Sequence, residues 1–293
     1  MSIASQLTAL EGNISDAYDM VAQRGGTVPA RKNMENLDDA IATIPSGGGG
    51  GISREVSAQG VYQMPTTSFT FSLPNTANDV GHYGLYRAFY SCTGITSANF
   101  SSLTSLSGIY AMDSAFSNCT NLASIDFSSL TTVSGTYVLQ STFSPCDSLT
   151  SVDFSSLTTI SGSSAMRNIF NGCSNLSSID FSSLTTISGS YAMNNAFAFC
   201  PSLTTATFNA LSDIKGNGAM SYAFSGCIGL TSVSFPALTT TSFGTRVNQF
   251  DNMLNGCTGV TVHFPAAIQS TIGSWASVTS GFSGTNTTVL FDL

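Results

Sequence analysis

The sequence predicts an α/β repeat solenoid, in which about eight copies of a 27-residue strand, turn and short helix unit stack behind an N-terminal α-helical stalk. Three observations support this fold class. Cysteines recur at a fixed interval, apolar residues hold fixed places around each cysteine, and the first 45 residues carry a different, helical spacing. A fixed period of about 20–50 residues is typical of solenoids, where each copy packs only against its neighbours.

Seven cysteines define the repeat. The first six are each 27 residues apart, and the last follows after 30 residues. Phenylalanine usually stands three residues before the cysteine and eight after it, while leucine usually stands three and eleven after it. Each copy is therefore expected to bury the same side chains. The cysteines, predicted to be structural core residues, are Cys92, Cys119, Cys146, Cys173, Cys200, Cys227 and Cys257.

Within one copy the apolar spacing changes from strand-like to helical. Residues 152–154 alternate apolar, polar and apolar, which predicts a short strand. Met166 and Ile169, ahead of the next cysteine, fall at helical spacing and predict a short helix whose apolar stripe faces the strand. Glycines such as Gly135 and Gly162 recur sixteen residues after the cysteine, and we expect them in a turn with positive φ.

Both ends of the solenoid depart from the period, as expected for terminal copies that shield the open core. The solenoid is predicted over residues 53–265, with an atypical first copy at about 53–91 as its N-terminal cap. In that copy Phe69 and Phe71 alternate with polar residues like a strand. Residues 266–293 lose the period but keep apolar residues near helical spacing, and we expect them to form the C-terminal cap.

The first 45 residues carry apolar side chains spaced alternately four and three apart, which is a heptad seam. This seam favours a coiled coil and self-association over the alternative, a single amphipathic helix that docks on a partner. Residues 46–52 are rich in glycine and form the predicted flexible linker to the solenoid. The predicted oligomerisation residues are Ile3, Leu7, Leu10, Ile14, Ala17 and Val21.

Composition excludes two classes of partner. Only 8% of the residues are charged, the net charge is -8, and the eight Lys and Arg residues form no cluster that could replace phosphate counterions. Nucleic-acid binding is therefore not expected. No run approaches the roughly 20 apolar residues that span a bilayer, and the N-terminus lacks the pattern of an export signal. We therefore expect that the protein is synthesised in a cytoplasm and does not insert into a membrane.

The sequence gives no sign of catalysis, a cofactor or a metal site. His82 and His263 are the only histidines, they lie far apart along the solenoid, and no nucleophile motif accompanies either. The glycine run 47–51 lacks the preceding strand and the GKS context of a phosphate-binding loop. The cysteines lie at one ladder position and form no Cys-x-x-Cys pair, which favours a buried, reduced ladder over disulfides or zinc.

Two rows of side chains are candidate binding surfaces. Aspartates project outward from three successive strands at about 4.8 Å spacing, where they form a solvated acidic stripe or, less favoured, share a divalent cation. Tyrosines recur eighteen residues after the cysteine position, where their rings suit contact with a protein or glycan but equally packing over neighbouring copies. The candidate ligand-binding residues are Tyr83, Tyr110, Tyr137, Tyr191, Asp126, Asp153 and Asp180.

The repeat resembles that of BspA-like leucine-rich-repeat proteins. In residues 115–131, AFSNCTNLASIDFSSLT, Ala-Phe precedes the cysteine, and Leu, Ile, an apolar residue and Leu follow it at the family's spacing. The repeats are longer than usual for the family, and Phe-Ser-Ser stands where a proline is common; Pro236 and Pro265 restore it late in the chain. The resemblance covers about residues 60–265. It implies a leucine-rich-repeat-like, right-handed stack and a role in adhesion or host-surface contact.

The first 45 residues resemble N-terminal modules of bacteriophage and prophage tail or fibre proteins, through SQLTALEGNISDAY at 5–18, GGTVP at 25–29 and NLDDAIATIPSGGGG at 36–50. This resemblance implies a virion protein assembled in the host cytoplasm, where cysteines stay reduced. The leading hypothesis is a homo-oligomeric virion accessory or fibre-like structural protein. Its stalk contacts other virion proteins, and its solenoid adheres to a bacterial or mucosal ligand. The alternatives are a bacterial cell-surface adhesin and a ligand-free decoration protein.

Overall fold

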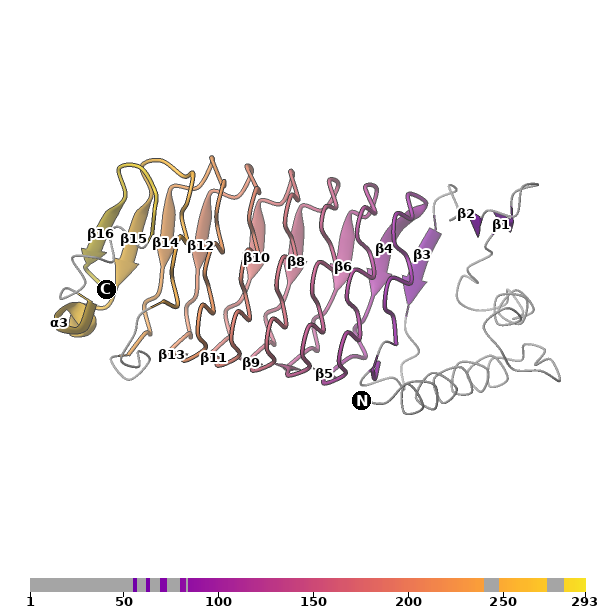
Figure 1. Ribbon diagram of the computed structural model, residues 1–293, viewed down its shortest axis with the longest axis horizontal. Coiled ribbons are helices and arrows are strands. Elements are labelled where there is room, and N and C mark those ends of the chain that lie inside the picture. Colours follow the sequence, from indigo (N-terminus) through magenta and orange to yellow (C-terminus); the bar gives the residue numbers. More distant parts are fainter. Residues whose placement is uncertain are drawn as a thin grey trace, which may run out of the picture.

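The computed structural model describes residues 55–56, 62–63, 69–72, 80–82, 84–239, 248–272 and 282–293. From Phe69 onwards the described residues form a parallel β-solenoid whose coils lie side by side in one long row (Figure 1). Paired residues of neighbouring coils are 27 apart in sequence, as in Ser178 and Ser151, which confirms the predicted repeat solenoid. The predicted stalk and linker, residues 1–52, lie outside the described residues.

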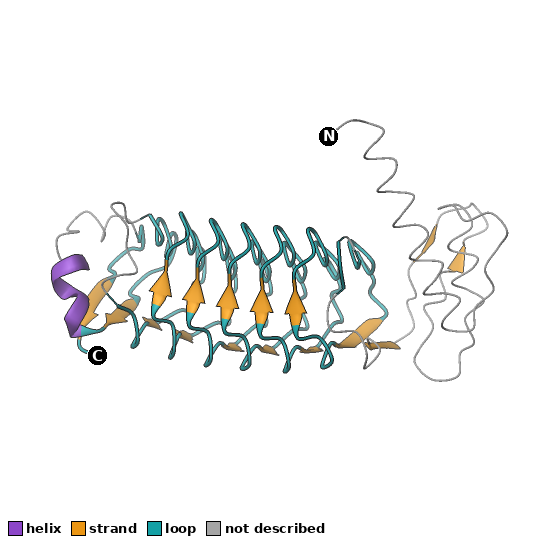
Figure 2. Cartoon of the chain, turned by 90° about the horizontal axis from the view of Figure 1, so that it is seen from below, coloured by secondary structure: helices purple, strands orange, loops and turns teal. Residues whose placement is uncertain are grey.

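Each coil contributes one strand to a first face, the five coils from β4 to β12 also contribute one to a second face, and all strand pairs on both faces are parallel. Figure 2 looks onto the second face. The first face contains β3 (Phe69–Ser72), β4 (Ile95–Asn99), β6 (Ser124–Asp126), β8 (Ser151–Asp153), β10 (Ser178–Asp180), β12 (Thr205–Thr207), β14 (Ser232–Ser234), β15 (Thr261–Phe264) and β16 (Thr288–Phe291). The second face contains β5 (Ser105–Leu106), β7 (Thr132–Val133), β9 (Thr159–Ile160), β11 (Thr186–Ile187) and β13 (Asp213–Ile214).

The third side of each coil is a chain of turns and not the short helix that the sequence predicts. We call this segment the turn ribbon; in one coil it spans residues 108–119. Its N–H groups donate alternately to a carbonyl oxygen of the same coil and to one of the next coil. Ala111 donates to the carbonyl oxygen of Gly108 in its own coil at 3.4 Å, and Met112 donates to that of Val138 in the next coil at 2.8 Å. Every fourth residue has a positive φ, which is 54° at both Tyr110 and Ser114.

The helix prediction is wrong because of the spacing between coils. Parallel strands hold neighbouring coils about 4.8 Å apart, whereas an α-helix with its side chains is about 10 Å wide. A helix in every coil would therefore force the strands apart or bend the stack. Apolar residues three and four apart, such as Met166 and Ile169, are still buried, because the turn ribbon also brings them to one side.

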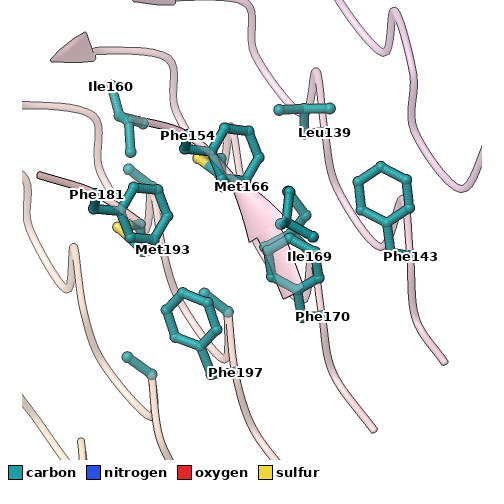
Figure 3. Packing of buried hydrophobic residues seen from close by; sticks show 14 of the residues in the cluster. Leu139, Phe143, Phe154, Ile160, Met166, Ile169, Phe170, Phe181, Met193 and Phe197 are labelled. Carbon is teal, nitrogen blue, oxygen red and sulfur yellow. The ribbon is translucent and has the colours of Figure 1, made fainter. Parts of the chain in front are cut away.

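Two columns of phenylalanine run through the core (Figure 3). In one column the rings of Phe143 and Phe170 stack with centroids 5.6 Å apart. In the other, Phe154 and Phe181 stack at 5.3 Å, and the columns meet edge to face, as between Phe154 and Phe170 at 6.3 Å. Offset stacking and edge-to-face contact are the favourable arrangements of aromatic rings. The same side chain in every coil therefore contacts its own copy in the next coil.

Both ends of the described solenoid add atypical strands. β3 pairs with β4, which confirms the strand predicted in the first copy. After β15 the chain forms a 3-10 turn, η2 (Ala266–Ile268), and a short helix, α3 (Gln269–Ile272), and β16 then pairs with β15. The tail thus adds one more strand to the stack. β1 (Glu55–Val56) and β2 (Tyr62–Gln63) form a separate antiparallel pair.

The recurring glycines are required by close packing between coils and not by positive φ, which corrects the sequence prediction. A Cβ on Gly162 would overlap the carbonyl oxygen of Gly135 in the preceding coil. That oxygen belongs to the backbone and cannot move away without separating the coils. The five glycines of this column, each of which would meet the preceding glycine's carbonyl, are Gly108, Gly135, Gly162, Gly189 and Gly216.

We expect Gly162→Ala to destabilise the protein by about 1–3 kcal/mol, as overpacking does, although Gly→Ala stabilises by about 0.4–1 kcal/mol at sites that accept alanine. Denaturant unfolding followed by circular dichroism measures the change. The control is Ser161→Ala at the neighbouring exposed position, which should stay within about 0.5 kcal/mol of the parent. Equal stability of the two variants would contradict close packing as the reason for the glycine.

Candidate functional site

All seven cysteines are free and buried, and each lies at the corner between the turn ribbon and the first face. The thiols bond across coils: Cys173 donates its S–H to the carbonyl oxygen of Phe143 at 3.0 Å, and Cys227 donates to that of Phe197 at 2.9 Å. Burial raises the pKa of the Cys119, Cys173 and Cys227 thiols to about 12. The thiols are therefore unreactive hydrogen-bond donors that tie each coil to the one before it.

The raised pKa of these thiols predicts a loss of stability in alkali. An unfolded thiol titrates near 9.0 and the folded Cys173 thiol near 12, so the folded state holds the proton more tightly. The contribution of such a thiol to the free energy of unfolding is complete below about pH 8 and is lost as the pH rises from 9 towards 12. At pH 10 each such thiol lowers the free energy of unfolding by about 1.4 kcal/mol.

Guanidinium unfolding at pH 7 and pH 10 measures this loss, with Cys173→Ala as the comparison. The variant lacks one titrating thiol, so its stability should fall by about 1.4 kcal/mol less than that of the parent between the two pH values. An identical fall in both proteins would contradict a buried, protonated Cys173.

The three aspartates of the first face each close a turn after their strand. Ser155 and Ser182 donate their N–H groups to Oδ1 of Asp153 and Asp180, both at 2.8 Å. Asp126 makes the same bond with Ser128, and Asn99 takes this role in the first regular coil. An amide can replace the carboxylate there, so the position requires a turn-forming acceptor and not a charge.

Neither row of candidate ligands forms a metal centre among the residues that the structure describes. No group of three or more His, Cys, Asp or Glu side chains comes together there. His82 accepts the Ile109 N–H through Nδ1 at 2.9 Å, and His263 contacts Asp292 at 3.0 Å near the C-terminal end. Both histidines thus join neighbouring coils.

Among the described helices, none has the length and apolar character to cross a bilayer.

The predicted tyrosine row divides into two parts. Tyr110 and Tyr137 stack on each other with centroids 5.0 Å apart, so these rings cover the turn ribbon. Ser164 takes the tyrosine position in the next coil and interrupts the row. Tyr191 stands beyond this gap, 44% exposed, with its ring lying over Gly218 of the following coil. Tyr83 lies outside the described residues.

Two more exposed aromatic residues lie on the turn ribbon, one in the same coil as Tyr191 and one in the next coil. Phe199 is 59% exposed, and its ring lies over Gly226, just as Tyr191 lies over Gly218. Tyr222 is 37% exposed and occupies the place of Asn195 in the next coil, between those two glycines in sequence. Among the described aromatic residues, none stacks on these three rings, in contrast to Tyr110. We call Tyr191, Phe199 and Tyr222 the aromatic patch.

Sequence reasoning missed Phe199 and Tyr222 because neither belongs to a row of like residues. The signal that reveals them is a departure from the repeat, namely an aromatic residue at a position where the other copies hold none. Phe199 replaces the small or polar residues that precede the other cysteines, and Tyr222 stands where its column otherwise has Arg, Ser or Asn. The residues in the Phe199 column are Ser91, Asn118, Pro145, Gly172, Gly226 and Gly256.

A parallel solenoid with a buried Leu, Phe and Cys core and one strand per coil on its first face is a repeat protein of the leucine-rich-repeat class. The chain belongs to the BspA type leucine-rich-repeat family, whose repeat region matches residues 62–192 and 136–276. This confirms the resemblance found in residues 115–131. Nothing in the comparisons points to a phage tail or fibre module.

Two solved structures illustrate what the chain is similar to. A leucine-rich repeat protein from Bacteroides ovatus is 16% identical, with 76% of this chain and 69% of that chain covered and a TM-score of 0.30. A leucine-rich cell surface protein from Faecalibacterium prausnitzii is 17% identical, with 75% and 78% covered and a TM-score of 0.17. No curated protein matches the sequence. At these TM-scores the family membership rests on the repeat match alone.

Proposed function

We propose that the protein is a surface-displayed adhesion protein that binds a bacterial or mucosal ligand through its solenoid, without catalysis and without a cofactor. The observation that carries this proposal is the aromatic patch. Tyr191, Phe199 and Tyr222 are exposed and have no stacking partner in the part of the chain that the structure describes. Aromatic residues are enriched at protein contact surfaces, where tyrosine is among the residues that contribute most to binding.

The chemistry of the patch suits a contact surface. Tyrosine and tryptophan combine a large apolar area with a polar group and dominate the energetics of many interfaces. Each of Tyr191 and Phe199 lies over a glycine, which supports one part of the ring and leaves the rest open to a partner. The surrounding surface carries few charges, since only 8% of all residues are charged. Contact through the patch is therefore apolar and weakly dependent on salt.

The family membership favours the cell-surface alternative over the virion hypothesis. The repeat match covers residues 62–276 and begins after the segment that resembles phage modules. BspA-like repeats imply adhesion, as the sequence resemblance already indicated. The virion location and the tail-fibre role rest only on residues 1–45, which lie outside the described residues.

An adhesion assay with the full chain tests the proposal. Purified protein is applied to immobilised mucin, to bacterial cells and to albumin as a reference surface. The variant Tyr191→Ser, Phe199→Gly and Tyr222→Asn replaces each aromatic with a residue that the same column holds in another coil, namely Ser164, Gly226 and Asn195. We expect the parent to bind mucin or cells above albumin, and the variant to bind at least tenfold more weakly.

The matched control is Tyr110→Ser with Tyr137→Ser, which removes two rings that stack on each other. This control should bind within about threefold of the parent, because these two rings stack on each other and do not belong to the aromatic patch. The proposal would be overturned if the parent bound neither mucin nor cells more strongly than albumin. It would also be overturned if the two variants lost binding equally. Circular dichroism establishes that both variants keep the parent fold.

We further propose that the heptad residues between Ile3 and Val21 join several chains into one oligomer. A heptad seam buries its apolar side chains only against another helix. Joining several weak binding surfaces raises the effective concentration of each, so avidity exceeds the affinity of one copy. The partners of this segment are then further copies of the same chain. Its residues lie outside the described residues, and the proposal rests on their spacing.

Light scattering of the full chain measures the oligomer. We expect a molar mass two or more times the 30.4 kDa of one chain, and a fall to one chain in Leu7→Asp with Leu10→Asp, because charges in the seam oppose its burial. The control, Thr8→Asp with Glu11→Gln, alters neighbouring positions outside the seam and should leave the mass unchanged. A parent that is already a single chain would contradict self-association.

A further inference from the structure

The first face of the solenoid opens between two neighbouring strands. β10 and β12 follow one another in the row (Figure 1), yet no hydrogen bond pairs them, although residues 174–211 are all described. β10 ends one sheet that runs back to β3, and β12 begins another that runs on to β16. We call this opening the seam.

The seam is local because hydrogen bonds join the two coils beyond both ends of the strands. On one side the Ser202 hydroxyl donates to the carbonyl oxygen of Ser174 at 2.7 Å. On the other side the Ser212 N–H donates to the carbonyl oxygen of Thr185 at 3.0 Å. The coils therefore stay at their usual spacing, and the seam is too narrow to admit another peptide strand, which needs about 4.8 Å on each side.

The seam lies where the strand sequence changes. Ser-Ile-Asp at residues 178–180 is followed by Thr-Ala-Thr at 205–207. Ile179 and Ala206 are partly exposed, whereas Val152 and Val233 at the same position in the coils on either side are 3% and 0% exposed. The opening thus uncovers a strip of apolar surface in an otherwise polar face.

A groove with a volume of about 480 Å³ lies over β8, β10 and β12 and so spans the seam. This volume falls within the range of about 300–1,000 Å³ that small-molecule sites occupy. Hydroxyl groups such as those of Ser178 and Thr205 line it, together with the carboxylates of Asp153 and Asp180 and the amide of Asn209. Val152, Ile179 and Phe181 contribute the apolar part.

The lining selects a class of ligand. Each carboxylate uses Oδ1 to hold its own turn, which leaves Oδ2 to accept a hydrogen bond from a ligand. No Lys or Arg is among the described residues that line the groove, so two carboxylates there oppose any anion. Many hydroxyl groups beside an apolar strip match a ligand with vicinal hydroxyls and an apolar C–H face. We propose that this groove binds a neutral saccharide.

This inference rests on the proposed function, since it names the ligand class of an adhesion protein, but it concerns a different surface from the aromatic patch. The two are therefore separable by experiment. Adhesion with no saccharide binding removes only the groove assignment. Saccharide binding without adhesion to mucin or cells removes the proposed function and keeps the groove.

The test uses the full chain and an array of neutral, sialylated and sulfated oligosaccharides, followed by calorimetric titration with the neutral oligosaccharide that gives the strongest signal. The informative variant is Asp180→Ala. Its matched control is Asp126→Ala, because Asp126 holds the same turn on the same face but does not line the groove. Any effect of losing the turn is common to both variants.

We expect neutral oligosaccharides to bind and anionic ones not to. Asp180→Ala should weaken the binding at least tenfold, and Asp126→Ala should stay within threefold of the parent. Thr205→Tyr, which fills the groove, should abolish binding, while Ser124→Tyr at the corresponding site of β6 should not. Absence of binding, a preference for anionic glycans, or equal losses in Asp126→Ala and Asp180→Ala would overturn the proposal.

Discussion

The spacing between coils, about 4.8 Å between hydrogen-bonded parallel strands, is the constraint on which the rest of this structure depends. It leaves no room for a Cβ between Gly135 and Gly162, and in a stack that does not bend it leaves no room for a helix on the third side of each coil. It also brings each phenylalanine within stacking distance of its copy, 5.3 Å between Phe154 and Phe181. The spacing between coils therefore accounts for the glycine column, the turn ribbon and the stacked aromatic rings.

The cysteines satisfy the same constraint in another way. A thiol is small enough to fit between coils and still reaches the carbonyl oxygen of the preceding one, as Cys173 reaches Phe143. Serine would offer a stronger donor, but a hydroxyl that loses its partner in a dry core costs more free energy than a thiol does. Cysteine thus contributes both apolar volume and a weak bond across coils, which explains its regular place without any redox role.

The period and the buried positions could be predicted from the sequence because every copy repeats them. The third side could not, because residues such as Met166 and Ile169 have the same apolar spacing in a helix and in a turn ribbon. The spacing between coils decides between the two, and it depends on strand pairing across the whole stack. The seam could not be predicted for a similar reason: Ala98 and Ala206 hold the same position in their coils, yet Ala98 pairs with Ile125 while β12 forms no pair with β10.

Comparing the copies of the repeat distinguishes residues that the fold requires from residues that are available for binding a partner. The coil that follows Cys200 keeps Leu203, Phe208 and Phe224 buried like its neighbours. Its surface, however, departs from the other copies at Thr207 and Tyr222, and Phe199 departs just before it. Since the other copies fold with small or polar residues at the Phe199 and Tyr222 positions, stability does not require these aromatic side chains. Both proposed binding surfaces include this stretch of chain, where core and surface have changed independently.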